Sequence, residues 1–406
     1  MKEHFITPYI RVLHSDIENH PLFEGFWPIP HGVTLNSYLV KGVKTALIDL
    51  TADWQEAIAG FNRQMDSSGS KIDYLILNHL EPDHAGYVAE FSKHNPDLEI
   101  LTTEKGAALV RNFIKVPESI KVRTVKTGDS LDLGGDIKLD FYEIPNVHWP
   151  ETMATFEKNS GTLFSCDAFG GFGKTGEKIF DDEFTEEEHK FYESESLRYY
   201  ATIVASFSTF VEKAITKLTE AGLEIKTIAP SHGIVWRKNP EKILQRYIRY
   251  AGYNTGKEQE DEICVLDSTM YGNSRKGLEA VLEGIRAVKG DNYKITILQV
   301  PQDDLSVVLA TAYKSRGLVI SAPTYEYKLF PPTAYILDLF NRKHFYGKKV
   351  LRIGSWGWVG GAKKEYEERT QGLKWEQVEQ YEWQGVPSEK DLETLREKGK
   401  ELASLL

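Results

Sequence analysis

The stretch His79-Leu80-Glu81-Pro82-Asp83-His84 follows the apolar run 74–78 and places four possible metal ligands within six residues. In a loop that leaves a strand end, alternate residues can converge, so we expect His79, Glu81 and Asp83 to meet, with His84 beside them. Two acids and two imidazoles buried there without compensation would cost several kcal/mol of desolvation. The stretch therefore predicts a metal site.

Three more candidate ligands lie in segments that read as loops or strand ends. They are His148 in NVHWPETM, Asp167 in FSCDAFGG and His232 in APSHGIVW, each with Gly or Pro close by. Gly and Pro fix irregular loop backbones, which suits residues that must be held in place. Isolated histidines elsewhere are expected to be ordinary surface or core residues.

The pattern H-x-E-x-D-H, followed by His148, Asp167 and His232, resembles the ligand pattern of the flavodiiron proteins. Relatives with a metallo-β-lactamase fold usually carry H-x-H-x-D-H and bind zinc, so Glu81 takes the place of a His. Three carboxylates then accompany four imidazoles, and hard oxygen donors favour iron over zinc. The resemblance implies an N-terminal metallo-β-lactamase-like αββα sandwich that holds two non-haem iron ions per chain.

The same resemblance distributes the ligands between the two irons. It assigns His79, Glu81 and His148 to one iron, Asp83, His84 and His232 to the other, and Asp167 as the bridging carboxylate. In some family members the counterpart of His84 leaves the metal to a solvent molecule, so the role of His84 stays open.

The chain changes character along its length, which predicts two domains. Short β-rich runs dominate up to about residue 168, and a long helical region is expected between residues 184 and 219. The polar segment 251–262, AGYNTGKEQEDE, reads as a linker. Beyond it strands and helices alternate five times, and continuous Val, Ile and Leu runs predict a doubly wound parallel sheet. We expect domains over residues 1–255 and 256–406.

The first loop of the C-terminal half predicts a phosphate site. Residues 267–274, DSTMYGNS, connect a strand to a helix, and backbone N–H groups at a helix N-terminus hold phosphate. The chain lacks both G-x-x-x-x-G-K-[ST] and G-x-G-x-x-G, which leaves flavodoxin-like FMN binding. Loops 321–325 and 355–361 should border the same crevice. The residues expected to bind FMN are Ser268, Thr269, Met270, Tyr271, Gly272, Asn273, Ser274, Pro323, Thr324, Tyr325, Ser355, Trp356, Gly357, Trp358 and Gly360.

Composition limits the partners and the compartment. Lys and Arg number 49 against 60 Asp and Glu, a net charge of −11 that argues against nucleic acid or an anionic membrane as partner. The two cysteines, Cys166 and Cys264, form no disulfide framework, and neither a signal peptide nor a membrane span is recognisable. We expect a cytoplasmic protein.

The resemblance implies that FMN relays electrons to the diiron centre, which reduces O₂ to water or NO to N₂O. It also implies a head-to-tail homodimer or a dimer of dimers. Two cysteines cannot supply the four thiolates of a rubredoxin iron, so the donor should be a separate rubredoxin or a reduced deazaflavin coenzyme.

Two other functions remain open from the sequence. One is a zinc-dependent hydrolase of the lactamase-like superfamily fused to a flavodoxin domain, which Glu81 fits poorly. The other is a flavodoxin-like electron carrier with a vestigial N-terminal docking domain, which predicts missing ligands, whereas all seven are present.

Overall fold

The computed structural model describes residues 3–20 and 22–406, which fall into two compact units. The first unit extends to Tyr199 and resumes over Phe207–Ile248. The second comprises Tyr200–Ser206 and Arg249–Leu406.

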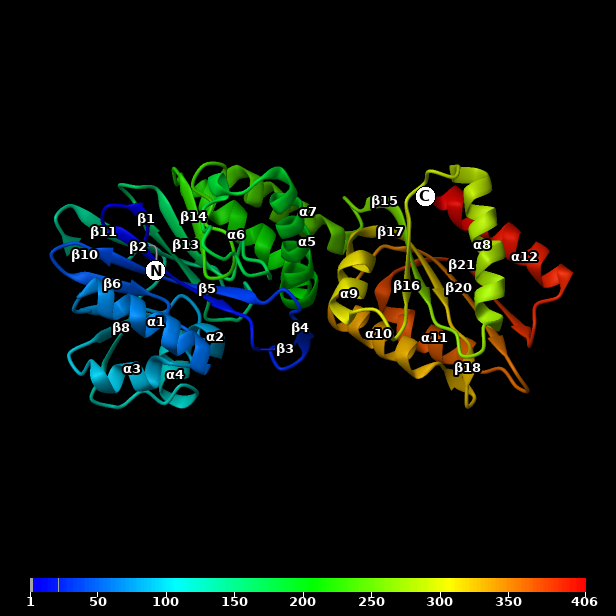
Figure 1. The fold of residues 1–406 in the computed structure, drawn as a ribbon, viewed down its shortest axis with the longest axis horizontal. Coiled ribbons are helices and arrows are strands. Elements are labelled where there is room, and N and C mark those ends of the chain that lie inside the picture. Colours follow the sequence, from blue (N-terminus) through cyan, green and yellow to red (C-terminus); the bar gives the residue numbers. More distant parts are fainter. Residues whose placement is uncertain (1–2, 21) are drawn as a thin grey trace. The chain divides into compact units, whose positions relative to one another are not determined.

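Two sheets form the centre of the first unit (Figure 1). The larger runs in the order β1-β2-β5-β6-β7-β8-β9 and the smaller in the order β10-β11-β12-β13-β14. The larger sheet consists of β1 (His4–Thr7), β2 (Ile10–Ile17), β5 (Val33–Lys41), β6 (Thr45–Ile48), β7 (Tyr74–Ile76), β8 (Glu99–Thr102) and β9 (Lys121–Thr124). The smaller consists of β10 (Ser130–Gly134), β11 (Ile137–Glu143), β12 (Met153–Glu157), β13 (Thr162–Cys166) and β14 (Thr227–Pro230). A separate hairpin pairs β3 (Leu22–Phe23) with β4 (Trp27–Pro28).

Successive side chains along the strands of the larger sheet point to opposite faces, so its apolar residues belong to two separate cores. Val40 and Ile48 pack with Leu139 of the smaller sheet. Their neighbour Leu47 points to the opposite face and packs with Phe61 of α1. Because successive strand residues face opposite sides, the larger sheet is buried both against the second sheet and against helices.

The helices of the first unit and the joining segment have the following bounds. They are α1 (Gln55–Ser68), α2 (Pro82–Ala85), α3 (Val88–His94), α4 (Glu104–Asn112), η1 (Asp181–Glu183), α5 (Glu186–Tyr199), η2 (Tyr200–Val204), η3 (Ala205–Phe207), α6 (Ser208–Glu220) and α7 (Pro240–Thr255).

The long helical region expected over residues 184–219 is not one continuous α-helix. Between α5 and α6 the chain forms the π-helical turn η2 and the 3₁₀ turn η3. Tyr200 belongs to the second unit, where its ring centroid lies 5.4 Å from that of Tyr250 and 6.0 Å from that of Tyr313. Hydrophobic periodicity indicates a helix but cannot show where the helix is interrupted. Here the interruption occurs where the ring of Tyr200 packs in the second unit.

The second unit is a parallel sheet in the order β16-β15-β17-β20-β21, with helices between its strands (Figure 1). This arrangement confirms the expected doubly wound sheet. Its elements are β15 (Glu260–Asp267), α8 (Asn273–Lys289), β16 (Ile295–Gln299), α9 (Leu305–Lys314), β17 (Ser315–Ser321), β18 (Thr324–Tyr325), β19 (Lys328–Leu329), α10 (Pro331–Arg342), β20 (Lys349–Trp356), α11 (Ala362–Thr370), η4 (Gln371–Leu373), β21 (Glu376–Gln384) and α12 (Glu389–Leu405).

The segment 251–262, expected as a linker, is mostly regular structure. Its first five residues are the end of α7 and its last three begin β15. Ala251 and Tyr253 are buried. The polar residues of the segment led to the prediction of a linker. Composition alone does not show which side chains of a helix face the core.

Candidate metal centre and flavin pocket

The candidate metal ligands follow the ends of strands from both sheets of the first unit. His79 and Glu81 lie in the loop after β7, and Asp83 and His84 lie in α2 directly behind it. Pro82 is the first residue of α2, a position where its missing N–H costs nothing. The remaining three, His148, Asp167 and His232, follow β11, β13 and β14 respectively.

The first group of ligands consists of His79, Glu81, His148 and Asp167. Oε2 of Glu81 lies 2.9 Å from Nε2 of His148 and 3.4 Å from Nε2 of His79. Oδ2 of Asp167 lies 3.3 Å from Nε2 of His148 and 3.2 Å from Nε2 of His79. Both imidazoles therefore direct Nε2 at the same pair of carboxylates.

The second group consists of Asp83, His84, His232 and again Asp167. Oδ2 of Asp83 lies 3.3 Å from Nε2 of His84 and 3.1 Å from Nε2 of His232. Oδ1 of Asp167 lies 2.8 Å and 3.3 Å from those nitrogens. Asp167 thus turns one oxygen to each group, which is the geometry of a bridging carboxylate.

The electrostatics of the cluster attract positive charge. Burial opposes protonation of the imidazoles, but the carboxylates beside their Nε2 atoms, Asp167 foremost, outweigh it and raise the pKa of His148 to about 9 and of His232 to about 10. Burial likewise opposes ionisation of Glu81, yet its bonds to His148 and His79 hold its pKa well below the ordinary value. A divalent cation at the Nε2 atoms would replace those protons.

Unpartnered atoms indicate that the cluster fits a pair of metal ions. Both carboxylate oxygens of Asp83, Oδ2 of Asp167 and Nε2 of His232 are buried, and despite the short distances between them they make no hydrogen bond of suitable geometry among the described residues. Such atoms are rare in folded proteins and call for an ion or another ligand. The ligand atoms within each group lie within 4.8 Å of one another, and the three carboxylates and four imidazoles suit iron.

Side chains around the cluster orient and enclose it. Nδ1 of His79 lies 2.7 Å from Oε1 of Glu151, whereas Nδ1 of His232 lies 3.1 Å from the carbonyl oxygen of Thr34. The H-bond from His79 outweighs burial and lowers the pKa of Glu151. Glu151 was not among the residues expected from the sequence, although its position three residues after His148 was a usable signal.

Aromatic rings close off the cluster from several sides. The ring of Trp149 lies 5.2 Å from that of His79, and the ring of Phe207 lies 6.0 Å from that of His148. Phe23 and Tyr199 each lie 5.5 Å from His232. These rings limit water access to the ligands.

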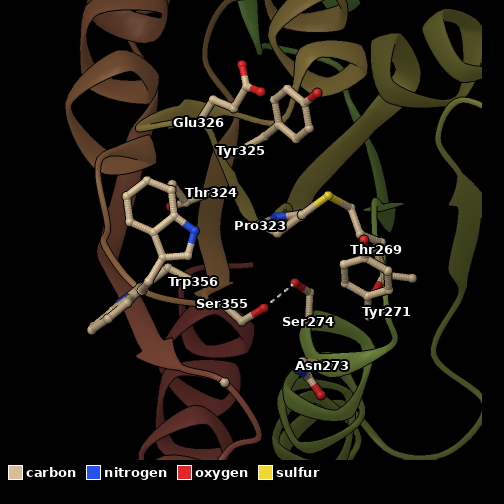
Figure 2. Close-up of a pocket in the computed structure, with 14 residues that line it drawn as sticks. Thr269, Tyr271, Asn273, Ser274, Pro323, Thr324, Tyr325, Glu326, Ser355 and Trp356 are labelled. Atoms are coloured by element: carbon tan, nitrogen blue, oxygen red, sulfur yellow. Dashed lines mark hydrogen bonds between the residues drawn. The ribbon is translucent and has the colours of Figure 1, made fainter.

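A pocket of about 430 Å³ lies at the carboxyl ends of the strands in the second unit (Figure 2). Trp356 and Tyr271 stand on opposite sides of it in that view, and Ser274 Oγ lies 2.9 Å from Ser355 Oγ between them. The volume lies within the range of small-molecule sites. The sequence-predicted residues that line it are Thr269, Met270, Tyr271, Asn273, Ser274, Pro323, Thr324, Tyr325, Ser355, Trp356, Gly357 and Trp358.

The residues of this pocket fit an FMN phosphate and ring. Helix α8 has Gly272 as its N-cap, so no side chain caps the helix, and its first N–H groups stay free for an anion. Oγ1 of Thr324 is buried without a hydrogen-bond partner among the described residues. Trp356 is half-buried, which leaves part of its ring available for stacking.

Three residues expected to bind FMN do not line the pocket: Ser268, Gly272 and Gly360. Ser268 is fully buried and its Oγ lies 2.8 Å from Oγ1 of Thr333, so it serves the core instead. Glu326 and Gly385 line the pocket and were not expected. Gly385 follows β21, and the rule that ligands bind beyond the carboxyl ends of parallel strands could have found it.

Comparison with known proteins agrees with this arrangement. The family model described as ODP family beta lactamase matches residues 33–233. The anaerobic nitric oxide reductase flavorubredoxin of Vibrio vulnificus (strain YJ016) is 33% identical over 377 residues, which cover 92% of this chain and 74% of that protein. The flavorubredoxin of the same description from Enterobacter sp. (strain 638) is 34% identical over 375 residues, 92% of this chain and 75% of that protein.

Solved structures share the whole fold. Rubredoxin oxygen:oxidoreductase from Desulfovibrio gigas has a TM-score of 0.91 at 25% identity and covers 100% of this chain and 98% of that chain. A flavo di-iron protein from Thermotoga maritima has a TM-score of 0.85 at 27% identity, with coverage of 100% and 98%.

The fold and the two sites define an oxidoreductase that joins a metallo-β-lactamase-like domain to a flavodoxin-like domain, which confirms the expected fold class. The chain belongs to the flavodiiron protein family. Within residues 3–20 and 22–406, no helix is both long and apolar enough to cross a membrane.

Proposed function

We propose that this chain reduces NO to N₂O, O₂ to water, or both, with electrons delivered through FMN. The observation that carries the proposal is the position of Asp167, whose two carboxylate oxygens face two separate ligand groups. Two metal ions held side by side can bind both atoms of a diatomic substrate or two substrate molecules. The names of the relatives, a nitric oxide reductase and an oxygen:oxidoreductase, support both substrates.

The assignment of residues to cofactors is part of the proposal. Residues 1–255 would hold two irons through His79, Glu81, Asp83, His84, His148, Asp167 and His232. Residues 256–406 would hold FMN in the pocket that Trp356 lines, with its phosphate at the start of α8. When bound, FMN supplies single electrons and the two irons supply the redox chemistry of the gas.

Residues around the candidate ligands orient the imidazoles and pack against them. Glu151 and the carbonyl of Thr34 each accept a hydrogen bond from the Nδ1 side of a cluster imidazole, so that Nε2 faces the ligand groups. Phe23, Phe207 and Trp149 stand against the imidazoles and exclude water. The substrates are small and uncharged, so they need no charged pocket of their own.

The surroundings of the enzyme follow from the same proposal. A separate electron donor, rubredoxin or a reduced deazaflavin coenzyme, would reduce the FMN. The active form would be a head-to-tail homodimer or a dimer of dimers in the cytoplasm. Analytical ultracentrifugation of the purified protein tests the oligomeric state, and a monomer would contradict it.

Metal and flavin analysis of the purified protein, followed by gas consumption assays, tests the function. We expect two irons and one FMN per chain, and consumption of NO or O₂ by the chemically reduced protein without accumulation of peroxide. Comparison of the two gases under the same conditions identifies the preferred substrate. Zinc in place of iron, with neither gas consumed, would contradict the proposal and favour a hydrolase.

A further inference from the structure

Glu151 is a buried carboxylate that contacts His79 at Nδ1, the ring nitrogen that does not face the other candidate ligands. Its side chain is fully buried, and Oε1 lies 2.7 Å from Nδ1 of His79 and accepts a hydrogen bond from the backbone N–H of Leu80 at 3.1 Å. The backbone carbonyl of Glu151 accepts a hydrogen bond from Thr103 Oγ1 at 2.9 Å, which anchors the loop. Among the described residues, no Lys or Arg pairs with Glu151, so His79 is the side chain with which its charge pairs.

Among the described contacts, no carboxylate accepts a hydrogen bond from Nδ1 of an imidazole in the second ligand group. Asp49 is a buried carboxylate whose charge acts on His84, but its oxygens accept hydrogen bonds from the backbone and side-chain N–H groups of Asn78. Nδ1 of His232 lies against the carbonyl oxygen of Thr34 at 3.1 Å, which is a neutral acceptor. A carboxylate that accepts the Nδ1–H pushes more electron density onto the imidazole than a carbonyl does, and it makes Nε2 a stronger metal donor. The two groups are therefore chemically unequal, although each offers two imidazoles and two carboxylates.

We propose that Glu151 makes the group with His79, Glu81 and His148 the stronger of the two metal sites, so that the sites fill in a fixed order. This inference rests on the proposed two-metal centre. The charges fit two divalent cations, because Glu151 and the three ligand carboxylates together carry four negative charges. Glu151 is a positioning residue, because it acts on the metal through His79.

The test measures metal binding and not turnover. Protein with FMN retained and metal removed by chelation is titrated anaerobically with Co²⁺, and binding is followed by visible absorption. We expect two binding steps in the wild type. Glu151→Gln keeps a hydrogen-bond acceptor and removes the charge, so it should weaken the tighter step about 10- to 100-fold and leave the weaker step unchanged.

A matched control and a spectroscopic readout separate this role from a general loss of structure. Glu143→Gln changes a half-buried carboxylate that bonds Thr127 and lies outside the cluster, and it should leave both steps unchanged. In the Co²⁺ protein, a coordinated imidazole gives a shifted, solvent-exchangeable Nδ1–H signal in the proton NMR spectrum. Glu151→Gln should move one such signal while the others stay in place.

The order of filling is tested independently of whether Glu151→Gln folds. His148→Ala should remove the tighter step, and His232→Ala should remove the weaker one. Loss of the tighter step in His232→Ala, or equal weakening of both steps in Glu151→Gln, would overturn the inference. Fewer than two equivalents of Co²⁺ bound by the wild type would instead contradict the two-metal centre on which it rests.

Discussion

Glu81 is the single residue that most clearly separates this cluster from a zinc site. Its Oε2 lies 2.9 Å from Nε2 of His148 and 3.4 Å from Nε2 of His79, so it lies beside two imidazoles of the candidate metal site. A carboxylate there adds a hard oxygen donor to the first group. Zinc accepts nitrogen-rich sets readily, whereas oxygen donors shift the preference toward iron.

We therefore expect Glu81→His to lower the iron content and raise the zinc content of protein produced with equal supplies of both metals. Gas consumption should be lost, because zinc has no redox chemistry. Elemental analysis and the NO and O₂ assays measure the two effects. Glu90→His, on an exposed part of α3, serves as control. Full activity of Glu81→His with iron bound would show that this carboxylate does not set the metal preference.

At the scale of elements, the start of α8 combines helix stability with anion binding. Asn273 is the first residue of the helix and lines the pocket. A negative charge at a helix N-terminus stabilises the helix by about 0.3–1 kcal/mol, yet it repels a phosphate at the same place. A negative charge at this position should therefore raise helix stability and lower phosphate affinity, so one substitution can separate the two effects.

Asn273→Asp should leave the thermal stability of the FMN-free protein unchanged or slightly higher. The same change should raise the dissociation constant of FMN about tenfold or more, since two like charges a few ångströms apart repel by more than 1 kcal/mol. Calorimetry and fluorescence titration with FMN measure the two quantities. Asn292→Asp, in an exposed loop, should change neither. Unchanged FMN affinity in Asn273→Asp would place the phosphate elsewhere.

The segment that leads into α7 depends on Asp181. Its two carboxylate oxygens accept hydrogen bonds from the backbone N–H groups of Arg237, Lys238 and Asn239, at 2.9, 2.9 and 2.7 Å. Asp181 is buried, whereas its neighbour Asp182 is partly exposed and pairs with the Arg237 side chain. Adjacent residues of the same type thus have very different roles.

Asp181→Ala should destabilise the first unit by about 3 kcal/mol, because it removes a buried, charged acceptor that three backbone N–H groups share. Asp182→Ala should cost less than about 1 kcal/mol, as is typical of an exposed ion pair. Chemical denaturation followed by tryptophan fluorescence measures both. Equal effects of the two substitutions would show that the buried hydrogen bonds do not stabilise this segment.

At the scale of the whole molecule, each compact unit has its own core and its own candidate cofactor site. A ligand that binds only the folded state stabilises it, by about 2.7 kcal/mol at 100 times its dissociation constant. Metal should therefore stabilise the first unit and FMN the second.

Removal of metal by chelation should lower the calorimetric transition of the first unit and leave that of the second unchanged. Removal of FMN should have the reverse effect. The Glu81→His protein, loaded with zinc, is a control in which the first transition stays high without iron. A single transition that shifts equally in both experiments would show that the units unfold together.

Sequence by itself determined the doubly wound sheet and selected the candidate ligands. Continuous apolar strands alternating with amphipathic helices are local signals, and they specified the five strands of the sheet, β15, β16, β17, β20 and β21. The close spacing of His79, Glu81, Asp83 and His84 is also local, and burial of such a set without a metal is costly. The assignment of these residues as iron ligands stays a prediction that the experiments above address.

Only the tertiary structure decided how distant residues meet. It turned the two oxygens of Asp167 toward different ligand groups, placed Glu151 behind His79 and broke the expected long helix at Tyr200. It also paired Ser268 with Thr333 outside the candidate flavin pocket. These features depend on contacts between segments far apart in the chain, and periodicity, spacing and composition do not specify such contacts.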